Sequence, residues 1–313
     1  MSNNQKKIYI TGVSGFIGSN LAKKLKELNY DVIGIIHSSN PLIEKELGIK
    51  VIENDLLKNN ILKLDNAYAV IHCATANDIL SKNTYSGLSL SILGTNKLLE
   101  SLKETEIKKL IFFSTAQVYG TELLGSLDEN TPVNCETFYG LNHYLGEELC
   151  KSYSLKFNLD ITVLRPTNVY GFYQASSVNR RTLVPVCFID EALQQGSITL
   201  RSSGKQTRNF ISNDELAEIA LNTLEDFPKG FSIRNCGSNW YSSILEIAEL
   251  VSESYEKFFK KKLVINIESE LPKSGNIFQY KSNFVKFRQE MTSSKINMKN
   301  VINKFFELSL KKL

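Results

Sequence analysis

The chain has 313 residues, which is enough for two domains of ordinary size or for one large α/β unit with an appended lobe. Hydrophobic residues make up 42% and charged residues 22% of the chain, which excludes disordered and fibrous proteins. The 37 Lys and Arg residues against 33 Asp and Glu residues leave a net charge of +4, too small to indicate a nucleic-acid or polybasic membrane partner.

The sequence predicts neither a membrane span nor a metal site. The longest apolar runs, such as residues 184–189, are far shorter than the roughly 20 residues needed to cross a bilayer. The polar N-terminus has no signal-peptide pattern. The five cysteines lie far apart and form no C-x-x-C pair, so neither a zinc site nor a disulfide framework is indicated. We therefore expect a cytoplasmic protein with no metal.

Short β-branched runs alternate with stretches of helical period in the first half of the chain. The predicted strands are residues 7–11, 31–36, 50–52, 69–73, 109–114 and 160–165. The predicted helices are residues 19–28, 85–104, 139–157, 185–195, 214–224 and 243–259. Strands and helices in turn indicate an α/β fold with a doubly wound parallel sheet.

The first strand runs directly into a glycine-rich turn, which reads Thr11-Gly12-Val13-Ser14-Gly15-Phe16-Ile17-Gly18. Gly12 permits the tight turn, Gly15 lets the backbone approach a pyrophosphate, and Gly18 allows the helix to pack closely on the strand. The N-terminus of that helix then faces the anion. A strand before the turn and a helix after it favour a dinucleotide site over an ordinary glycine-rich turn.

Further motifs follow in sequence order. They are Val70-Ile71-His72-Cys73-Ala74, Gly94-Thr95-Asn96-Lys97-Leu98-Leu99, Ser114-Thr115-Ala116-Gln117-Val118-Tyr119-Gly120, Tyr139-Gly140 with Gly146-Glu147, Arg165-Pro166-Thr167-Asn168-Val169-Tyr170-Gly171, and Gln206-Thr207-Arg208-Asn209-Phe210. Together with the glycine turn, this series resembles the extended short-chain dehydrogenase/reductase family, which includes nucleotide-sugar epimerases, dehydratases and 4-ketoreductases. The resemblance covers about residues 6 to 240.

This resemblance implies a Rossmann-type doubly wound sheet with a smaller C-terminal substrate-binding lobe. We expect residues 1–175 to form the NAD(P)-binding domain and residues 176–313 to form mainly the nucleotide-sugar lobe, with the stretch 205–240 returning to the first domain. Helices 85–104 and 139–157 correspond to those that form a four-helix bundle in dimers of the family, so a homodimer is also expected.

The end of the second predicted strand bears on the choice of cofactor. NAD-binding units usually carry Asp or Glu there, which accepts hydrogen bonds from ribose hydroxyls and repels a 2′-phosphate. Here the sequence reads Ile36-His37-Ser38-Ser39 and has no carboxylate, so the side chains of His37, Ser38 and Ser39 could face a phosphate. NADP is therefore favoured. An arginine, the usual phosphate partner, is absent, and NAD stays the alternative.

The resemblance implies further contacts with the cofactor. They come from Gly12, Ser14, Gly15, Phe16, Ile17 and Gly18 in the turn, from Asp55 and Leu56 after the third strand, and from Cys73, Ala74 and Thr75 after the fourth. Asp55 would contact the adenine, the alternative being a plain loop aspartate. His72 lies within a strand and is expected to be a core histidine with its hydrogen bonds satisfied.

The same resemblance places the catalytic groups. Tyr139 would supply or remove a proton at a sugar oxygen while hydride moves between the sugar and the nicotinamide, and Thr115 would orient that oxygen by a hydrogen bond. The family pattern is Y-x-x-x-K, but His143 stands in place of the lysine. With an ordinary histidine pKa near 6.5, His143 would be mostly neutral at pH 7, which leaves Tyr139 protonated. A protonated tyrosine is the acid that a ketoreductase needs.

Two further observations concern the substrate. Dehydratases of the family carry Asp-Glu after the catalytic threonine, where this chain has Ala116 and Gln117, which disfavours a 4,6-dehydratase. The resemblance implies substrate contacts from Gln117, Asn168, Leu183, Val184 and Arg208. The stretch from Asn179 to Pro185 would wrap the nucleotide base, with Arg180 and Arg181 either contacting phosphate or simply solvated.

Three hypotheses follow. The first is an NADP(H)- or NAD(H)-dependent reductase of the C4 keto group of a nucleotide-linked 6-deoxyhexose. The second is a nucleotide-sugar 4-epimerase with tightly bound NAD. The third is a protein that binds dinucleotide and nucleotide sugar but has lost turnover together with the lysine.

Overall fold

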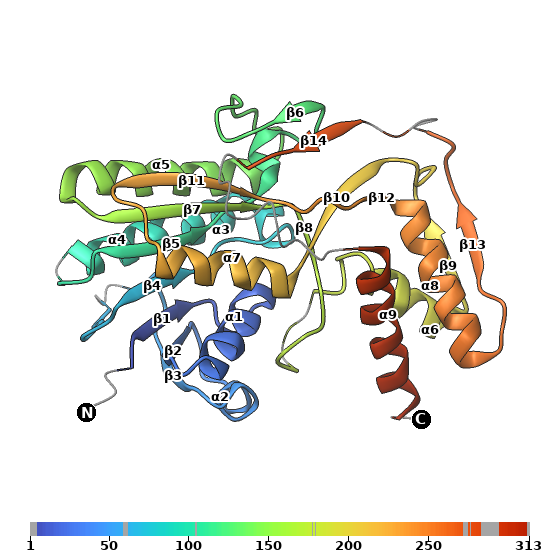
Figure 1. Cartoon of the computed structure of the whole chain (residues 1–313), viewed down its shortest axis with the longest axis horizontal. Coiled ribbons are helices and arrows are strands. Elements are labelled where there is room, and N and C mark those ends of the chain that lie inside the picture. The colour runs from blue at the N-terminus through green and yellow to red at the C-terminus, as the bar shows by residue number, and fades with distance from the viewer. Residues whose placement is uncertain are drawn as a thin grey trace.

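A computed structural model shows how the chain is arranged (Figure 1). It describes residues 5–58, 62–103, 105–176, 178, 180–271, 275, 277–282 and 294–311. Two residues within the predicted segments, Glu104 and Asn179, lie outside this part of the chain.

Seven parallel strands form the central sheet, in the order β11-β7-β5-β4-β1-β2-β3. Their bounds are β1 (Lys7–Thr11), β2 (Asp31–Ile36), β3 (Lys50–Glu53), β4 (Ala69–His72), β5 (Lys109–Phe113), β7 (Asp160–Pro166) and β11 (Phe231–Cys236). The strand order reverses between β1 and β4, which is where doubly wound sheets bind ligands at the carboxyl ends of their strands. The predicted α/β fold with a Rossmann-type parallel sheet is confirmed.

Helices cover both faces of this sheet (Figure 1). One face carries α1 (Phe16–Glu27), α2 (Pro41–Leu47) and α7 (Asn213–Glu225). The other carries α4 (Thr95–Lys103) and α5 (Phe138–Phe157), and α3 (Thr84–Leu88) packs against α5. Two separate hydrophobic clusters result, one on each face.

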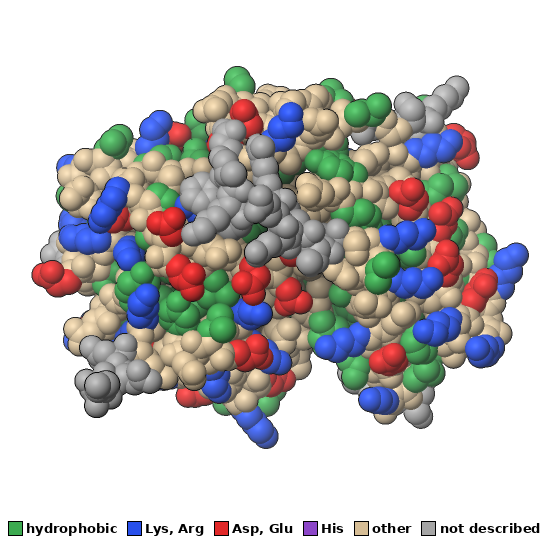
Figure 2. Space-filling model, viewed as in Figure 1, with side chains coloured by type: hydrophobic (Ala, Val, Ile, Leu, Met, Phe, Trp, Pro, Cys, Tyr) green, Lys and Arg blue, Asp and Glu red, His purple; other side chains and the backbone are tan. Residues whose placement is uncertain are grey.

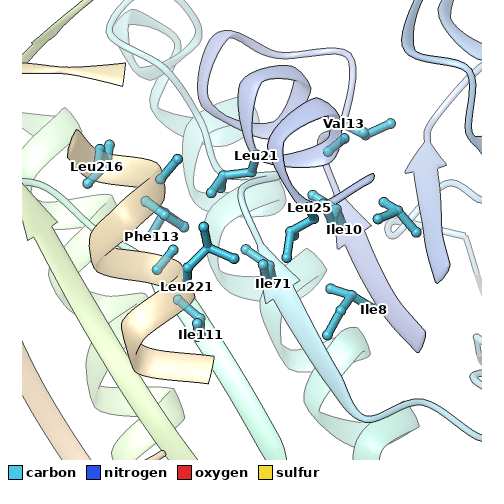
Figure 3. Packing of buried hydrophobic residues seen from close by; sticks show 14 of the residues in the cluster. Ile8, Ile10, Val13, Leu21, Leu25, Ile71, Ile111, Phe113, Leu216 and Leu221 are labelled. Carbon is cyan, nitrogen blue, oxygen red and sulfur yellow. The ribbon is translucent and has the colours of Figure 1, made fainter. Parts of the chain in front are cut away.

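Alternation along the strands supplies both clusters. Ile8 and Ile10 of β1 point toward α1 and α7, where they meet Leu21 and Leu25, while Tyr9 belongs to the cluster on the opposite face (Figure 3). Each such fully buried aliphatic side chain contributes about 1.5–3 kcal/mol to stability. This double burial explains why the central strands are largely apolar along their length.

The C-terminal part of the chain builds a third cluster beside the sheet. It is formed by α6 (Val186–Gln195), β9 (Ser197–Leu200), α8 (Ile244–Phe259), β13 (Val264–Ile267) and α9 (Lys295–Leu310). Two small sheets connect this lobe with the part of the chain that forms the central sheet. In one, β8 (Asn168–Tyr170) and β12 (Tyr241–Ser243) flank β10 (Thr207–Ser212). In the other, β6 (Gly125–Leu127) pairs with β14 (Phe278–Tyr280). Within the stretch 205–240, α7 packs on α1 and β11 pairs with β7. The division at residue 175 stays a prediction.

The helix expected at 85–104 is not a uniform α-helix. Its middle, Ser89–Gly94, is a π-helix (η2) between α3 and α4. A π-helical turn holds one more residue than an α-helical turn, and such turns occur frequently near functional sites. The 3₁₀ turns η1 (Leu80–Lys82) and η3 (Ala116–Tyr119) complete the elements.

The surface carries mixed charge. Figure 2 shows basic and acidic side chains interspersed over the face that it presents. None of the described helices is both long and apolar enough to cross a bilayer. Within the described ranges, no group of three or more His, Cys, Asp or Glu side chains is placed to hold a metal ion.

Candidate active site

The turn after β1 brings bare backbone to the edge of the sheet. Gly12 has a φ of 67°, and a Cβ atom there would lie 2.9 Å from backbone atoms of Cys73 and Ala74. A Cβ atom on Gly18 would lie 2.4 Å from the Gly12 carbonyl oxygen. A side chain at either glycine would therefore force β1, β4 or α1 to move. The N-terminus of α1 begins at Phe16 and borders the same space.

A cavity of about 410 Å³ lies at the carboxyl ends of β1, β4, β5 and β7. Its lining includes residues from all three predicted groups, those for cofactor, catalysis and substrate. They are Gly12, Gly15, Phe16, Ile17, Gly18, Cys73, Thr75, Thr115, Gln117, Tyr139, His143, Asn168, Leu183 and Val184. The structure thus brings most of the predicted site residues into one cavity.

The other predicted site residues are absent from the described lining. They are Ser14, His37, Ser38, Ser39, Asp55, Leu56, Ala74 and Arg208. His37 to Ser39 follow β2 and are exposed. Asp55 accepts a hydrogen bond from the Leu57 amide at 2.9 Å, and Arg208 donates one to the Thr207 carbonyl at 3.3 Å. The ligand contacts expected of these residues stay predictions.

Thr115, Tyr139 and His143 lie close together because α5 begins directly against η3. A Cβ atom on Gly140 would lie 2.6 Å from the Gln117 carbonyl oxygen, so a side chain there would push α5 away. Tyr139 and His143 are one helical turn apart, and their ring centroids are 4.7 Å apart in an edge-on arrangement. The first two turns of α5 therefore present both rings to the cavity beside Thr115.

Both rings are electrically neutral near pH 7. Burial raises the pKa of Tyr139 above its ordinary value of 10.0, although a hydrogen bond with Thr115 and the positive charge of Arg180 act in the opposite direction. Burial lowers the pKa of His143 to about 4, although a hydrogen bond with the Phe113 backbone opposes this. His143 therefore supplies no positive charge to Tyr139.

His72 is the core histidine that the sequence predicts. It is fully buried, and hydroxyl groups meet both of its ring nitrogens: Thr11 lies 2.6 Å from Nδ1 and Thr95 lies 3.0 Å from Nε2. Burial lowers the pKa of His72 to about 3, and His143 acts in the same direction. His72 is thus a structural residue that ties β4 to β1 and α4.

The two buried histidines predict a dependence of stability on pH. The unfolded chain binds protons near pH 6.5, while folded His143 stays neutral until about pH 4, so the free energy of unfolding falls as pH drops through this range. His143 alone accounts for on the order of 3 kcal/mol, because each pKa unit corresponds to about 1.4 kcal/mol. Urea unfolding at a series of pH values should show a flatter profile for His143→Gln. The exposed His37→Gln serves as control, and an equally flat profile there would contradict the assignment.

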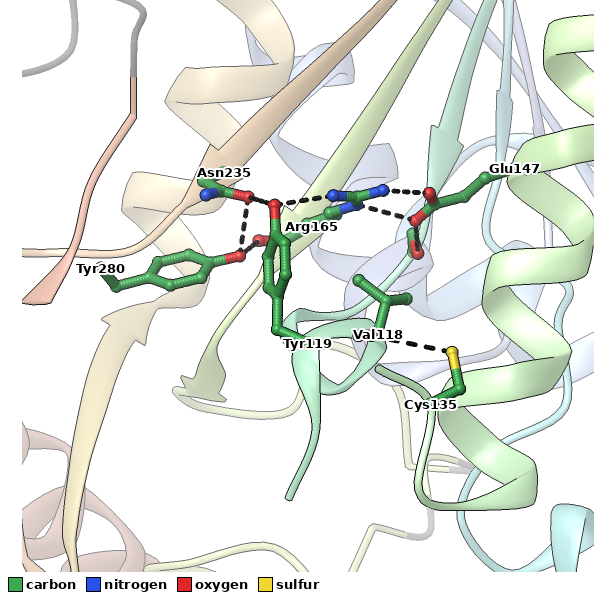
Figure 4. Close-up of polar contacts among 8 residues, drawn as sticks. Val118, Tyr119, Cys135, Glu147, Arg165, Asn235 and Tyr280 are labelled. Atoms are coloured by element: carbon green, nitrogen blue, oxygen red, sulfur yellow. Dashed lines mark hydrogen bonds and ion pairs between the residues drawn. The ribbon is translucent and has the colours of Figure 1, made fainter. Parts of the chain in front are cut away.

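An ion pair between Arg165 and Glu147, shielded from water, lies next to the strand end that carries Thr115 (Figure 4). The Arg165 guanidinium donates to both carboxylate oxygens of Glu147, at 3.0 and 2.5 Å, and the two side chains are 3% and 2% exposed. Ser114, the neighbour of Thr115, donates to the same carboxylate, and Arg165 donates to the Tyr119 hydroxyl at 2.6 Å. These contacts tie the end of β5 to α5 and β7.

Some residues that line the cavity are not among the site residues that the sequence predicts, or have no single role assigned to them there. They are Ala76, Asn77, Asp78, Phe113, Ser114, Pro166, Thr167, Val169, Arg180, Thr182, Phe210 and Ile244. Asn77 and Asp78 come shortly after a predicted strand end, a position that could have indicated them. Phe210 ends one of the motifs of the family resemblance, whereas Ile244 carries no local signal. Arg180 lines the cavity, whereas Arg181 is 65% exposed and lies 3.4 Å from Asp190.

Comparison with known proteins identifies the family. A model described as "NAD dependent epimerase/dehydratase family" matches residues 8–237, which is most of the chain. The chain belongs to this family. It is accordingly an enzyme of the extended short-chain dehydrogenase/reductase group, as the motif series predicts. Members of the epimerase/dehydratase family similar to this chain include nucleotide-sugar epimerases, dehydratases and decarboxylases.

Three relatives illustrate the range. An uncharacterised UDP-glucose epimerase of Bacillus subtilis is 32% identical over 266 residues, covering 79% of this chain and 81% of that protein. A dTDP-D-glucose 4,6-dehydratase of Dictyostelium discoideum is 30% identical over 273 residues, covering 79% of this chain and 61% of that protein. The UDP-glucuronic acid 4-epimerase of Bacillus cereus, solved with UDP-glucuronic acid and NAD, superposes with a TM-score of 0.81 at 25% identity, covering 98% of this chain and 100% of that one.

Proposed function

We propose that this chain is a nucleotide-sugar 4-epimerase that keeps NAD bound and acts on a UDP-linked sugar. One observation carries the proposal: the glycine turn, the Thr115 and Tyr139 hydroxyls, and Asn168 on the lobe side all line one cavity. The Bacillus cereus relative, which is a 4-epimerase, contains UDP-glucuronic acid and NAD together. A single cavity of this kind would let one enzyme hold sugar and cofactor in contact.

The residues of the cavity fit a dinucleotide. A Cβ atom at Gly12 or Gly18 would collide with protein backbone, so these glycines let β1, β4 and α1 pack closely and bring the N-terminus of α1 to the cavity, where a pyrophosphate would bind. The Nδ1 atom of His143 is buried with no hydrogen-bond partner among the described residues, and it could bond a ribose hydroxyl. NAD, when bound, accepts a hydride from the sugar and returns it. We favour NAD over the NADP of the sequence-based expectation, because the similar Bacillus cereus structure contains NAD.

Residues of the chain itself would carry out the proton transfer at the sugar C4 oxygen. Tyr139 acts from its deprotonated form: it takes the proton of the C4 hydroxyl as the hydride leaves and gives it back after the sugar has turned its other face. Thr115 holds the same oxygen by a hydrogen bond. Ala116 and Gln117 have no carboxylate that could remove a C5 proton, so the 4,6-dehydratase reaction of some relatives is not proposed.

A second candidate is reduction of a 4-keto sugar nucleotide. Its support is the protonation state of the site: burial raises the pKa of Tyr139 and lowers that of His143, so the resting tyrosine is an acid. A ketoreductase needs this acid, whereas an epimerase must first generate tyrosinate. Oxidation and reduction pass through the same transition state, which the resting protonation state of Tyr139 does not alter. Reduction is therefore the second candidate, after epimerisation.

One experiment separates the two reactions. Purified protein is denatured to release bound nucleotide, and native protein is incubated with UDP-glucose, UDP-galactose or UDP-glucuronic acid without added cofactor. An epimerase releases NAD and interconverts C4 epimers, which NMR of the sugar protons detects. A reductase instead consumes added NADPH or NADH, and only with a 4-keto sugar nucleotide. If the protein bound the nucleotide sugar and the dinucleotide but catalysed neither conversion, the epimerase and the reductase proposals would both be wrong. The third hypothesis, a binding protein without turnover, would then remain.

The homodimer implied by the resemblance stays a prediction. Large apolar side chains are exposed on helices that pack against each other, namely Tyr85 on α3, Leu93 on η2 and Leu155 on α5. Such a surface fits a subunit interface. The molar mass in solution, measured by sedimentation, tests it: a mass of one chain would contradict the dimer.

A further inference from the structure

The acid/base role of Tyr139 raises an electrostatic question. Tyr139 must lose its own proton, and so become an anion, before it can accept a proton from the sugar, and an anion is costly in a site shielded from water. The adjacent His143 does not offset this charge, because burial keeps it neutral above a pKa of about 4. Among the described residues that line the cavity, Arg180 is the only lysine or arginine.

Arg180 is held at the cavity by a partner from the opposite wall. Its Nη1 atom lies 2.9 Å from Oδ1 of Asp78, and the Thr182 hydroxyl lies 3.4 Å from Oδ2 of the same carboxylate. The Arg180 side chain is 18% exposed, against 42% for Asp78, so the cation is the more buried member of the pair. Arg180 precedes α6, whereas Asp78 follows β4, so the pair joins the two sides of the site.

We propose that Arg180, oriented by Asp78, is the positioning residue that stabilises the anionic form of Tyr139. The inference rests on the proposed acid/base role of that tyrosine. A guanidinium stays protonated at any working pH, so its charge does not depend on the reaction step. Of the two charges in the pair, Arg180 has the larger effect on the pKa of Tyr139 and lowers it, while Asp78 raises it.

The other ionisable groups around Tyr139 do not replace Arg180. Within the cavity, burial raises the pKa of the Cys73 thiol, which therefore stays neutral. Lys82, Glu136 and Cys135 line a shallower cavity with Tyr139 on its other side, but Lys82 and Glu136 are exposed, and water and salt screen their charges.

The test is a titration of Tyr139 itself. Tyrosinate absorbs in the ultraviolet more strongly than tyrosine, and the difference between each protein and its own Tyr139→Phe counterpart isolates this residue among 13 tyrosines. We expect Arg180→Gln to raise the pKa of Tyr139, giving an about tenfold smaller tyrosinate fraction at a given pH. Asp78→Asn should lower that pKa, and Arg180→Lys should retain most of the wild-type behaviour.

Arg181→Gln is the matched control. This neighbouring arginine is 65% exposed and is paired with Asp190, so its loss should leave the titration of Tyr139 unchanged. If the Arg180–Asp78 pair served only to hold the two sides of the site together, removing either partner would destabilise the site in the same way. Opposite shifts for Arg180→Gln and Asp78→Asn are therefore the signature of the electrostatic role, and the lowered pKa expected for Asp78→Asn carries the test if Arg180→Gln fails to fold.

Shifts in the same direction, or none, would overturn the proposal, as would an equal shift in Lys82→Gln. A raised KM for the sugar nucleotide with an unchanged titration would make Arg180 a substrate-binding residue instead. The titration needs no turnover, so it separates this inference from the proposed function. Opposite shifts without epimerisation would leave the inference intact, and epimerisation without shifts would refute the inference alone.

Discussion

Tyr139→Phe should lower turnover by a factor of about 10²–10⁴ while both ligands still bind, because it removes the proton donor and acceptor but little else. The phenylalanine ring keeps its edge-on contact with His143, where the ring centroids are 4.7 Å apart. The glycine turn that would hold the dinucleotide is on β1 and α1 and does not depend on this hydroxyl. Initial rates, with nucleotide content measured on the same sample, test the expectation.

Tyr153→Phe provides the control on the same helix. The Tyr153 hydroxyl donates to Asn96 at 2.9 Å and also to Glu100, and the residue is absent from the described lining of the cavity. Its loss should leave the rate near that of the natural protein. If Tyr139→Phe kept a wild-type rate, or if Tyr153→Phe lost activity to the same extent, the assignment of Tyr139 would be wrong.

Arg165→Met should destabilise the fold by about 3–5 kcal/mol, the usual cost of leaving one charge of a buried pair without its partner. Glu147 would then keep a carboxylate that is 2% exposed, with the Ser114 hydroxyl as its one remaining donor among the described residues (Figure 4). Arg165 also donates to Tyr119, whose ring it covers at 4.9 Å from the centroid. Urea unfolding followed by circular dichroism measures the change.

Two further variants serve as a rescue and as a control for this expected loss of stability. Adding Glu147→Gln to Arg165→Met removes the stranded charge and should recover part of the loss. Lys299→Met breaks an exposed pair, in which Lys299 lies 2.7 Å from Glu253 with side chains 41% and 54% exposed, and should cost only about 0–1 kcal/mol. A loss below about 1 kcal/mol for Arg165→Met would show that the buried pair adds little to stability.

The sheet is largely predictable from the sequence because most of its strands are buried on both faces. Six predicted strands coincide closely with β1, β2, β3, β4, β5 and β7. Burial on both faces requires continuous apolar residues, which is a local signal. The seventh strand, β11, escaped prediction, because Phe231–Cys236 contains Arg234 and Asn235 and becomes a strand only through its pairing with β7.

The candidate site divides in the same way. Tyr139 and His143 are one helical turn apart, so local spacing was enough to predict that they share a helix face, whereas only the family resemblance placed Thr115 beside them. The family resemblance then supplied their roles. By contrast, no local pattern joins Asp78 to Arg180, because both lie in irregular connections whose paths depend on the packing of the two lobes.

The sequence by itself therefore determined most strands of the sheet, the glycine turn and the helix that carries Tyr139 and His143, since each depends on residues within a few positions of one another. Tertiary structure alone decided the electrostatics of the site. Burial makes His143 neutral, and folding sets Arg180 against Asp78 and Arg165 against Glu147. Charge effects of this kind depend on distance and on exclusion of water, and both exist only once the chain is folded.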